Sequence, residues 1–161
     1  MAFFDSEKYQ KKTDAHAVQI HFVPLLAQNE DQGRVNFGFD RAIHEMASLK
    51  PVPPVGVTFL PSLLQPKSSG WIELTSNNPN DHPIIEPNYL SHEDDVEVLS
   101  EAWKFCDRLA NTASMKKALK GPLEDDSVTN RYPYGSDEYI KYKIKRDVVT
   151  VSRNFHEQQP A

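Results

Sequence analysis

The sequence predicts an α+β domain in which an antiparallel sheet is flanked by helices, and three observations support this prediction. Residues 18–23 and 55–60 alternate in polarity with the two-residue period of strands. A turn-rich segment at 77–83 separates two short apolar runs, which is typical of a hairpin. Residues 93–111 carry apolar side chains at helical spacing. A length of 161 residues suits one domain with a single core.

The strands follow from alternation and from the residues that interrupt it. In residues 18–23 (VQIHFV), apolar side chains alternate with Gln19 and His21, and Pro24 ends the run. Residues 55–60 (VGVTFL) predict a second strand and residues 71–75 (WIELT) a third. Turn residues at 77–83 then return the chain to Ile84 and Ile85, which predicts a hairpin.

The clearest helix is expected from Glu93 to Asn111, with a capping box formed by Ser91 and Asp94. Its apolar stripe is expected to pack on the sheet and consists of Val96, Leu99, Trp103, Cys106 and Ala110. Shorter helices are predicted at 40–49 and 115–120, and another at 137–146 begins after Ser136. The β-branched residues 148–151 predict a final strand.

Composition excludes several classes of function. The net charge of −5, without a basic stripe, disfavours nucleic acid and anionic membranes as partners. Prolines interrupt the longest uncharged apolar run, residues 51–66, so no membrane-spanning helix is expected. Cys106 is the only cysteine, which excludes an internal disulfide and a cysteine-based zinc site. Charged residues within 1–10 do not resemble a secretory signal, and the compartment stays open.

Catalytic and metal-binding motifs are incomplete. The pairs His44–Glu45 and His92–Glu93 lack the second histidine of a helical zinc motif. The glycine spacing at 33–38 is not followed by the lysine of a phosphate loop, and no serine stands in a nucleophile elbow. The acidic run over residues 94–101 is expected to be a solvated helix face. No metal site and no catalytic residue are predicted.

Gln19 and His21 are the candidate site residues. They share one face of the predicted strand 18–23, opposite its apolar face. That face either lines a substrate pocket or meets solvent, and the residue pattern alone favours solvent. The residues by themselves therefore leave the function open.

Residues 57–91 resemble the substrate-binding part of glucose-methanol-choline (GMC) oxidoreductases, particularly the insect glucose dehydrogenase-like branch. The family pattern P-K-S-R-G, a strand, a D-P turn and P-x-I-x-P-N-Y appear here in the same order. The corresponding segments are residues 66–70 (PKSSG), 71–76 (WIELTS), 78–79 (NP) and 83–89 (PIIEPNY). Ser69 stands where the family has arginine. The resemblance extends over residues 14–151.

The resemblance implies three parts: an N-terminal leader at 1–13, a partial substrate-binding domain at 14–151, and an unrelated, disordered tail at 152–161. In the family, an antiparallel sheet covers FAD, which a separate domain holds through a G-x-G-x-x-G motif. This chain has no such motif, so it is expected to bind no FAD alone. Its implied partners are the FAD-binding domain and a small alcohol or sugar. Many insect members of the family are secreted.

The resemblance ends abruptly after Val151. Family members place their proton-abstracting histidine in a Y-H-P-x-G-T-C segment, where this chain has Ser152, Arg153 and Asn154. A guanidinium keeps its proton, so Arg153 is not a base. His156 lies three residues later without the surrounding motif, and no catalytic role is transferred to it. The expected function is a partial substrate-binding domain of an FAD-dependent alcohol or sugar oxidoreductase, inactive alone. The alternative is a non-enzymatic interaction or binding module that re-uses the fold.

Overall fold

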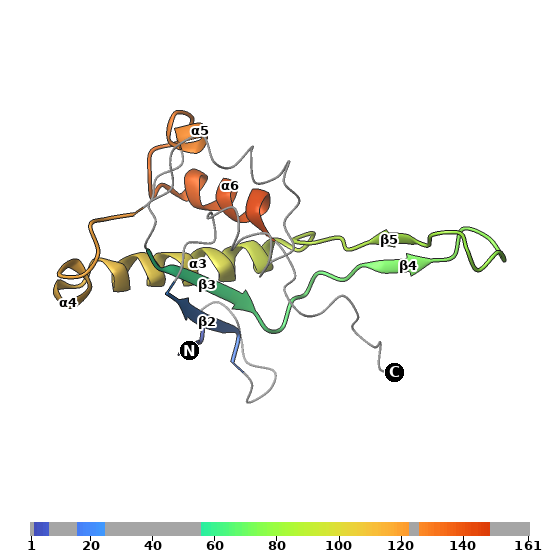
Figure 1. The fold of residues 1–161 in the computed structure, drawn as a ribbon, viewed down its shortest axis with the longest axis horizontal. Coiled ribbons are helices and arrows are strands. Elements are labelled where there is room, and N and C mark those ends of the chain that lie inside the picture. The colour runs from blue at the N-terminus through green and yellow to red at the C-terminus, as the bar shows by residue number, and fades with distance from the viewer. Residues whose placement is uncertain (1, 7–15, 25–55, 123–125, 149–161) are drawn as a thin grey trace.

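The first part of the fold is a three-stranded antiparallel sheet (Figure 1). The computed structural model describes residues 2–6, 16–24, 56–122 and 126–148. The sheet has the order β1-β2-β3, formed by Ala2–Phe4, Val18–Val23 and Thr58–Leu63. The pairing of His21 with Leu60 fixes the register of the two longer strands. β2 lies in the centre, so both of its edges are hydrogen-bonded.

The long helix α3, Glu93–Ala110, packs against one face of this sheet. Alternation turns Val18 and Ile20 toward the helix, where both side chains are buried. They share one core cluster with Ala17, Val98, Ala102 and Cys106. This cluster holds the sheet and α3 together through apolar burial.

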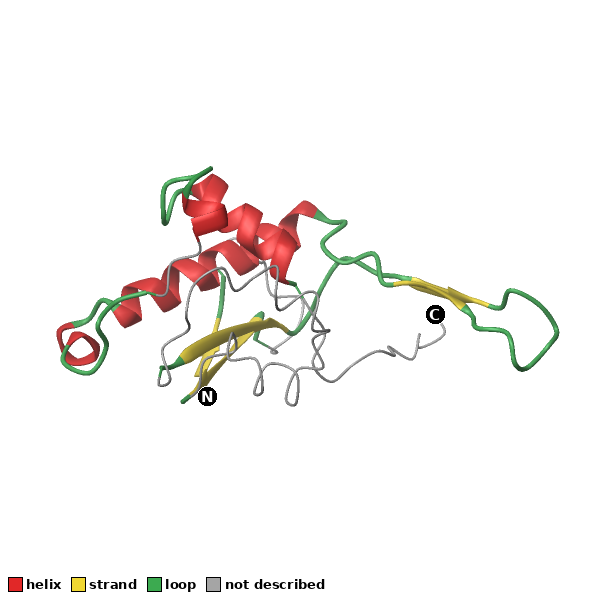
Figure 2. Ribbon diagram, turned by 45° about the horizontal axis from the view of Figure 1, so that its top comes forward, coloured by secondary structure: helices red, strands yellow, loops and turns green. Residues whose placement is uncertain are grey.

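A second helix, α6, spans Asp137–Asp147 and packs on α3 away from the sheet (Figure 2). Its Tyr139 and Ile140 are buried together with Val128 of the short helix α5, Asp126–Thr129. Trp103 joins this second cluster, and its ring centroid lies 6.1 Å from that of Tyr139. The expectation that Trp103 faces the sheet is therefore wrong. α3 lies between two layers, so it needs two apolar faces instead of one stripe.

The caps agree with the sequence at one helix and differ at another. The side chain of Ser136 accepts a hydrogen bond from the Tyr139 amide and caps α6, as predicted. α3 is capped by His92, whose Nδ1 accepts from the Asp94 amide at 3.2 Å, instead of by Ser91. The short helix α4 spans Ala113–Lys116 and ends earlier than predicted.

The remaining strands, β4 (Trp71–Glu73) and β5 (Ile84–Glu86), form the predicted antiparallel hairpin. Residues 71–86 are called the arm below, because they project from the rest of the molecule (Figures 1 and 2). The sheet and the helices α3 to α6 are called the body. No other described element covers either face of the arm.

Predicted and observed strands agree closely at β2 and less well at β3. β3 begins three residues later than the alternation predicted and contains Pro61. Proline is tolerated there because β3 is an edge strand of the described sheet. β1 was not predicted and lies within the segment 1–13. The predicted helix at 40–49 and residues 149–151 of the last predicted strand lie outside the described residues. None of the described helices is long and apolar enough to span a membrane.

Candidate functional site

Gln19 and His21 lie on the face of the sheet opposite α3. Both belong to the central strand β2, and both are half-buried. Cross-strand pairing places Gln19 beside Ser62 and His21 beside Leu60, with Phe3 next to Gln19 on the other side. An amide and an imidazole on one face can donate and accept hydrogen bonds to a hydroxylated ligand. A role in substrate binding remains a prediction.

Catalytic histidines are commonly oriented by a carboxylate. Within the described ranges, two histidines have such a neighbour: His16 lies 3.0 Å from Asp5 and His92 lies 3.8 Å from Asp94. Both pairs lie at exposed positions, and neither includes His21. Arg153 and His156, which the resemblance compares with the family's histidine segment, lie outside the described residues.

The P-K-S-S-G segment, residues 66–70, lies between β3 and the arm and is hydrogen-bonded to the start of α3. Asp95 is fully buried, and its two carboxylate oxygens accept from the amides of Lys67 at 2.9 Å and Ser68 at 2.8 Å. The Ser68 hydroxyl accepts from the His92 amide at 3.0 Å. Asn88, at the other side of the arm, donates to the Ser69 carbonyl at 2.9 Å. The motif therefore holds the two ends of the arm against the helix.

The expectation that the acidic run is a solvated face is wrong for Asp95. This residue lies four positions before Leu99, on the apolar side of α3, and it is buried there because two backbone amides compensate its charge. Its place in the helical period was the signal that could have identified it. Asp94 follows the expectation: it is exposed and pairs with the Lys67 ammonium. That hydrogen bond lowers the pKa of Asp94 below the ordinary carboxyl value.

Gly70 is the last residue before β4, and its backbone lies close to the backbone of Glu86 and Pro87 at the end of β5. A Cβ atom at this position would lie 2.1 Å from the Glu86 carbonyl oxygen and 2.7 Å from the Pro87 carbonyl carbon. Both are backbone atoms that cannot rotate away. Only glycine allows the strands to converge in this way.

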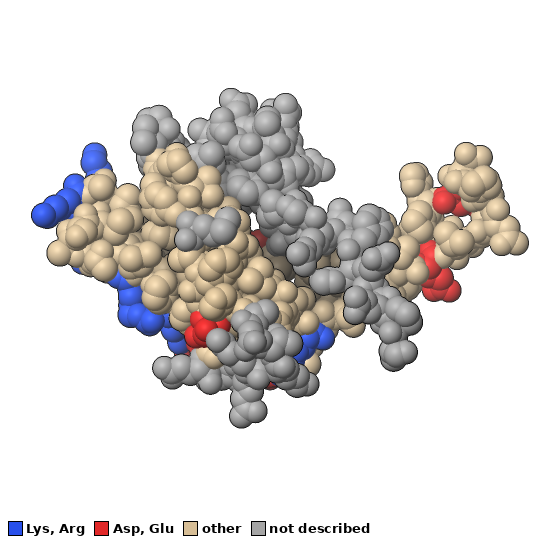
Figure 3. All heavy atoms as spheres, turned by 90° about the horizontal axis from the view of Figure 1, so that it is seen from below, with Lys and Arg blue, Asp and Glu red and all other residues tan. Residues whose placement is uncertain are grey.

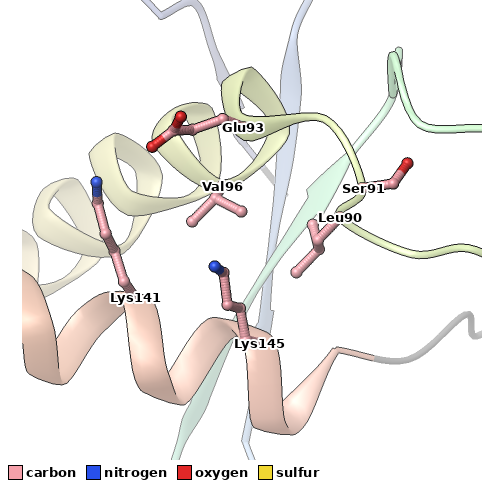
Figure 4. Close-up of a pocket in the computed structure, with 6 residues that line it drawn as sticks. All are labelled: Leu90, Ser91, Glu93, Val96, Lys141 and Lys145. Atoms are coloured by element: carbon pink, nitrogen blue, oxygen red, sulfur yellow. The ribbon is translucent and has the colours of Figure 1, made fainter.

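A pocket of about 250 Å³ opens between the first turn of α3 and the C-terminal half of α6 (Figure 4). Its lining residues are Leu90, Ser91, Glu93, Val96, Lys141 and Lys145. Lys141 is paired with Glu97 of α3, and this hydrogen bond raises the pKa of the lysine. Gln19 and His21 do not line this pocket, so the structure does not unite it with the predicted site.

The described residues contain no group of three His, Cys, Asp or Glu side chains that could hold a metal ion. Cys106 lies in the core between α3 and the sheet, and burial raises the pKa of its thiol to about 11. Such a thiol has little thiolate at neutral pH and is a poor nucleophile. The expectation that Cys106 is a core residue is confirmed.

Charge is unevenly distributed over the surface (Figure 3). Basic side chains gather at the end of the molecule that carries α4, where Lys116, Lys117 and Lys120 are exposed. The arm carries acidic side chains, among them Glu73 and Glu86. A partner that binds the arm must therefore accommodate negative charge.

Comparison with known families gives a match over the second part of the chain. A family model described as GMC oxidoreductase matches residues 66–157, which is more than half of the 161 residues. The match begins in the P-K-S-S-G segment and includes the arm, α3 and α6. It continues six residues beyond Val151.

Relatives from several organisms share this region. The Drosophila melanogaster glucose dehydrogenase [FAD, quinone] is 35% identical over 94 residues, 56% of this chain and 15% of the relative. The mitochondrial choline dehydrogenase of Mus musculus is 34% identical over 102 residues, with 63% and 14% covered. The Pseudomonas putida alcohol dehydrogenase [acceptor] is 32% identical over 114 residues, with 70% and 17% covered. The chain spans only about a sixth of these relatives, and by its α+β fold and its matched segments it belongs to the GMC oxidoreductase family.

Proposed function

We propose that this chain is the substrate-binding part of an FAD-dependent oxidoreductase that acts on CH–OH groups of alcohols or sugars, and that it is inactive alone. The family match over residues 66–157 carries the proposal. The names of three relatives, a glucose, a choline and an alcohol dehydrogenase, support the substrate class, because each name denotes a compound with a hydroxyl group.

The described residues do not fit FAD by themselves. A dinucleotide fold places diphosphate at a helix N-terminus that follows a parallel strand. Here the described strands pair antiparallel, and the first turn of α3 contains Glu93, Asp94 and Asp95. Three carboxylates at that position repel a diphosphate. The flavin is therefore assigned to a separate FAD-binding domain, which would place its substrate side against this chain.

The polar face of the sheet is the proposed substrate wall. Gln19 and His21 project from the central strand on the side that α3 leaves free. Their amide and imidazole groups suit hydrogen bonds to a substrate hydroxyl. On the opposite face of β2, Val18 and Ile20 are buried in the core. The proposed role of these two residues is to bind and orient substrate, with redox chemistry supplied by the cofactor.

The test begins with a titration of FAD by the purified chain. We expect flavin fluorescence and visible absorption to stay unchanged, and no dye-coupled oxidation of alcohols by the chain alone. Turnover is expected only when an FAD-binding domain and the family's missing histidine segment are both supplied. Arg153→His alone should restore nothing, because a base needs a positioned substrate and a hydride acceptor. Saturable quenching at micromolar concentrations would contradict the proposal.

One observation favours the alternative of a non-enzymatic interaction module: the arm exposes apolar side chains that a protein partner can cover. The two candidates differ in the behaviour of the chain alone. A sharp thermal transition without aggregation favours an independent module, whereas aggregation through exposed apolar surface favours a part of a larger enzyme.

A further inference from the structure

The arm is the part of the described molecule with the most uncovered apolar surface. Nine large hydrophobic side chains are exposed among the described residues, and five of them belong to the arm, with exposures of 45% to 78%. They are Trp71, Ile72, Leu74, Ile84 and Ile85. A cluster of this kind on a projecting element marks a contact surface.

Both faces of the arm contribute. Directly paired residues point to the same side, so Ile72 and Ile85 share one face. Trp71 pairs with Glu86, and Glu73 pairs with Ile84, which places two apolar and two acidic side chains on the other face. Because apolar side chains lie on both faces, only a partner that surrounds the hairpin can remove all of them from water.

The arm is also held in a fixed shape before any partner binds. An isolated two-stranded hairpin is only marginally stable in water. Here Asp95 and Asn88 hold its base, as described above. At its tip, Asp81 accepts from Ser76 at 2.5 Å and from Asn78 at 3.0 Å. Such preorganisation lowers the entropy cost of docking.

We propose that the arm inserts into a groove of the FAD-binding domain and is the main element that joins the two parts. This inference rests on the proposed function. The matched segments form only 14% to 17% of the three relatives, so a much larger part of such proteins is available to enclose the arm. A second copy of this chain fits less well, because stacking two arms covers one face of each and leaves the other in water.

Charge further defines the groove. Glu73 and Glu86 lie on the same face as Trp71 and Ile84, so one wall must offer basic groups or hydrogen-bond donors. The wall that contacts Ile72 and Ile85 must be apolar. The two walls of the partner's groove therefore differ in character: one is apolar and the other is electropositive.

The test uses the full 161-residue chain and the FAD-loaded remainder of the Drosophila melanogaster relative, expressed without its matching segment. Binding is measured by biolayer interferometry for the parent chain and for Ile72→Thr/Ile85→Thr. Threonine keeps the β-branch while removing apolar surface, so the double variant should bind at least about tenfold more weakly. The matched control is Phe22→Thr/Leu109→Gln, which alters two exposed apolar residues of the body and should bind within about twofold.

A second variant tests the electropositive wall. Glu73→Gln should weaken binding a few-fold at low ionic strength, and the effect should fade in 0.5 M salt. Thermal melting of each variant, followed by circular dichroism, verifies that the body still folds.

The outcomes separate the two proposals. If the parent chain binds and Ile72→Thr/Ile85→Thr binds equally well, docking by the arm is wrong and the proposed function stands. If the parent chain does not bind a flavin-loaded partner, both proposals fail. Sedimentation that shows an arm-dependent dimer would identify a second copy as the occupant and overturn the inference.

Discussion

The body and the arm contain the same kinds of side chain and differ in what covers them. Ile140 in α6 is fully buried in a cluster with Val128 of α5 and Trp103 of α3, whereas Ile85 in β5 is 61% exposed. The apolar side chains of the body are buried because α3 has an apolar layer on each side. The arm has two strands and no second layer among the described elements. Apolar content alone therefore does not make a core, since a facing layer is also required.

Hydrogen bonds at the base of the arm join the two regions. Asp95 is part of the helix α3 in the body, and it binds the amides of Lys67 and Ser68 in the P-K-S-S-G segment that leads into the arm. Its burial makes this connection specific, because a carboxylate without those donors would be unfavourable inside the protein. Asp95 is therefore the buried member of the set of hydrogen bonds that holds the base of the arm to α3.

The largest expected effect compares the same substitution in both regions. Ile140→Ala removes a fully buried side chain and should lower the free energy of unfolding by about 2–5 kcal/mol. Ile85→Ala on the exposed arm should lower it by less than about 1 kcal/mol. Urea unfolding followed by circular dichroism measures both. Equal losses would mean that the arm is covered within this chain.

Chemical accessibility gives a second, slightly smaller contrast. Burial raises the pKa of the Cys106 thiol from 9.0 to about 11, so its thiolate fraction at pH 8 should be about a hundredfold lower than that of a free thiol. Alkylation by iodoacetamide should be slower by at least this factor. In a Cys106→Ala chain, Ile85→Cys should react at nearly the rate of a peptide thiol, because that position is exposed.

The same pKa has a consequence for stability. Above pH 9 the unfolded chain loses the Cys106 proton while the folded chain keeps it, so the free energy of unfolding should fall as the pH rises from 9.0 to about 11. Cys106→Ala should remove that fall. Rapid labelling of Cys106 in the folded chain would show that α3 separates readily from the sheet.

The local elements could largely be predicted from the sequence. β2, the hairpin and α3 follow from patterns of period two and 3.6 within one segment, and Ser136 is a local cap. The two-sided burial of α3 could not be predicted in this way. Trp103 contacts Tyr139, which is distant in sequence, and no local period records which layer a side chain meets.

For the candidate site too, local features could be predicted from the sequence and contacts with distant segments could not. The alternation of β2 places Gln19 and His21 on one face, but the strand does not encode what covers that face. Asp95 was missed because an acidic run was treated as a unit, although its members face different directions around the helix. Its partners, the amides of Lys67 and Ser68, are backbone groups without a sequence signature.

A smaller effect is expected at the junction of the two regions. Asp95→Asn replaces an acceptor oxygen by an amide nitrogen, which leaves one buried backbone amide unpaired and should cost about 1–3 kcal/mol. Hydrogen exchange at Lys67 and Ser68 should accelerate, because their amides lose protection. Glu93→Gln, at an exposed position of the same helical turn, is the matched control and should change neither quantity. If hydrogen exchange at these two amides is unchanged in Asp95→Asn, Asp95 does not hold the junction together.

The smallest expected effect is at the neighbouring Asp94, which pairs with Lys67 at the surface. Its folded pKa is lowered from 3.8 by the hydrogen bond from Lys67, so the pair stabilises the fold above pH 3.8 and this contribution disappears as the pH falls through the lowered value. Asp94→Asn should therefore lower the melting temperature slightly at pH 7 and not at all at a pH below the folded pKa. High salt should diminish the difference, because both side chains are about half exposed. A loss at pH 7 as large as that of Asp95→Asn would show that the ion pair, and not the buried carboxylate, holds the arm to the body.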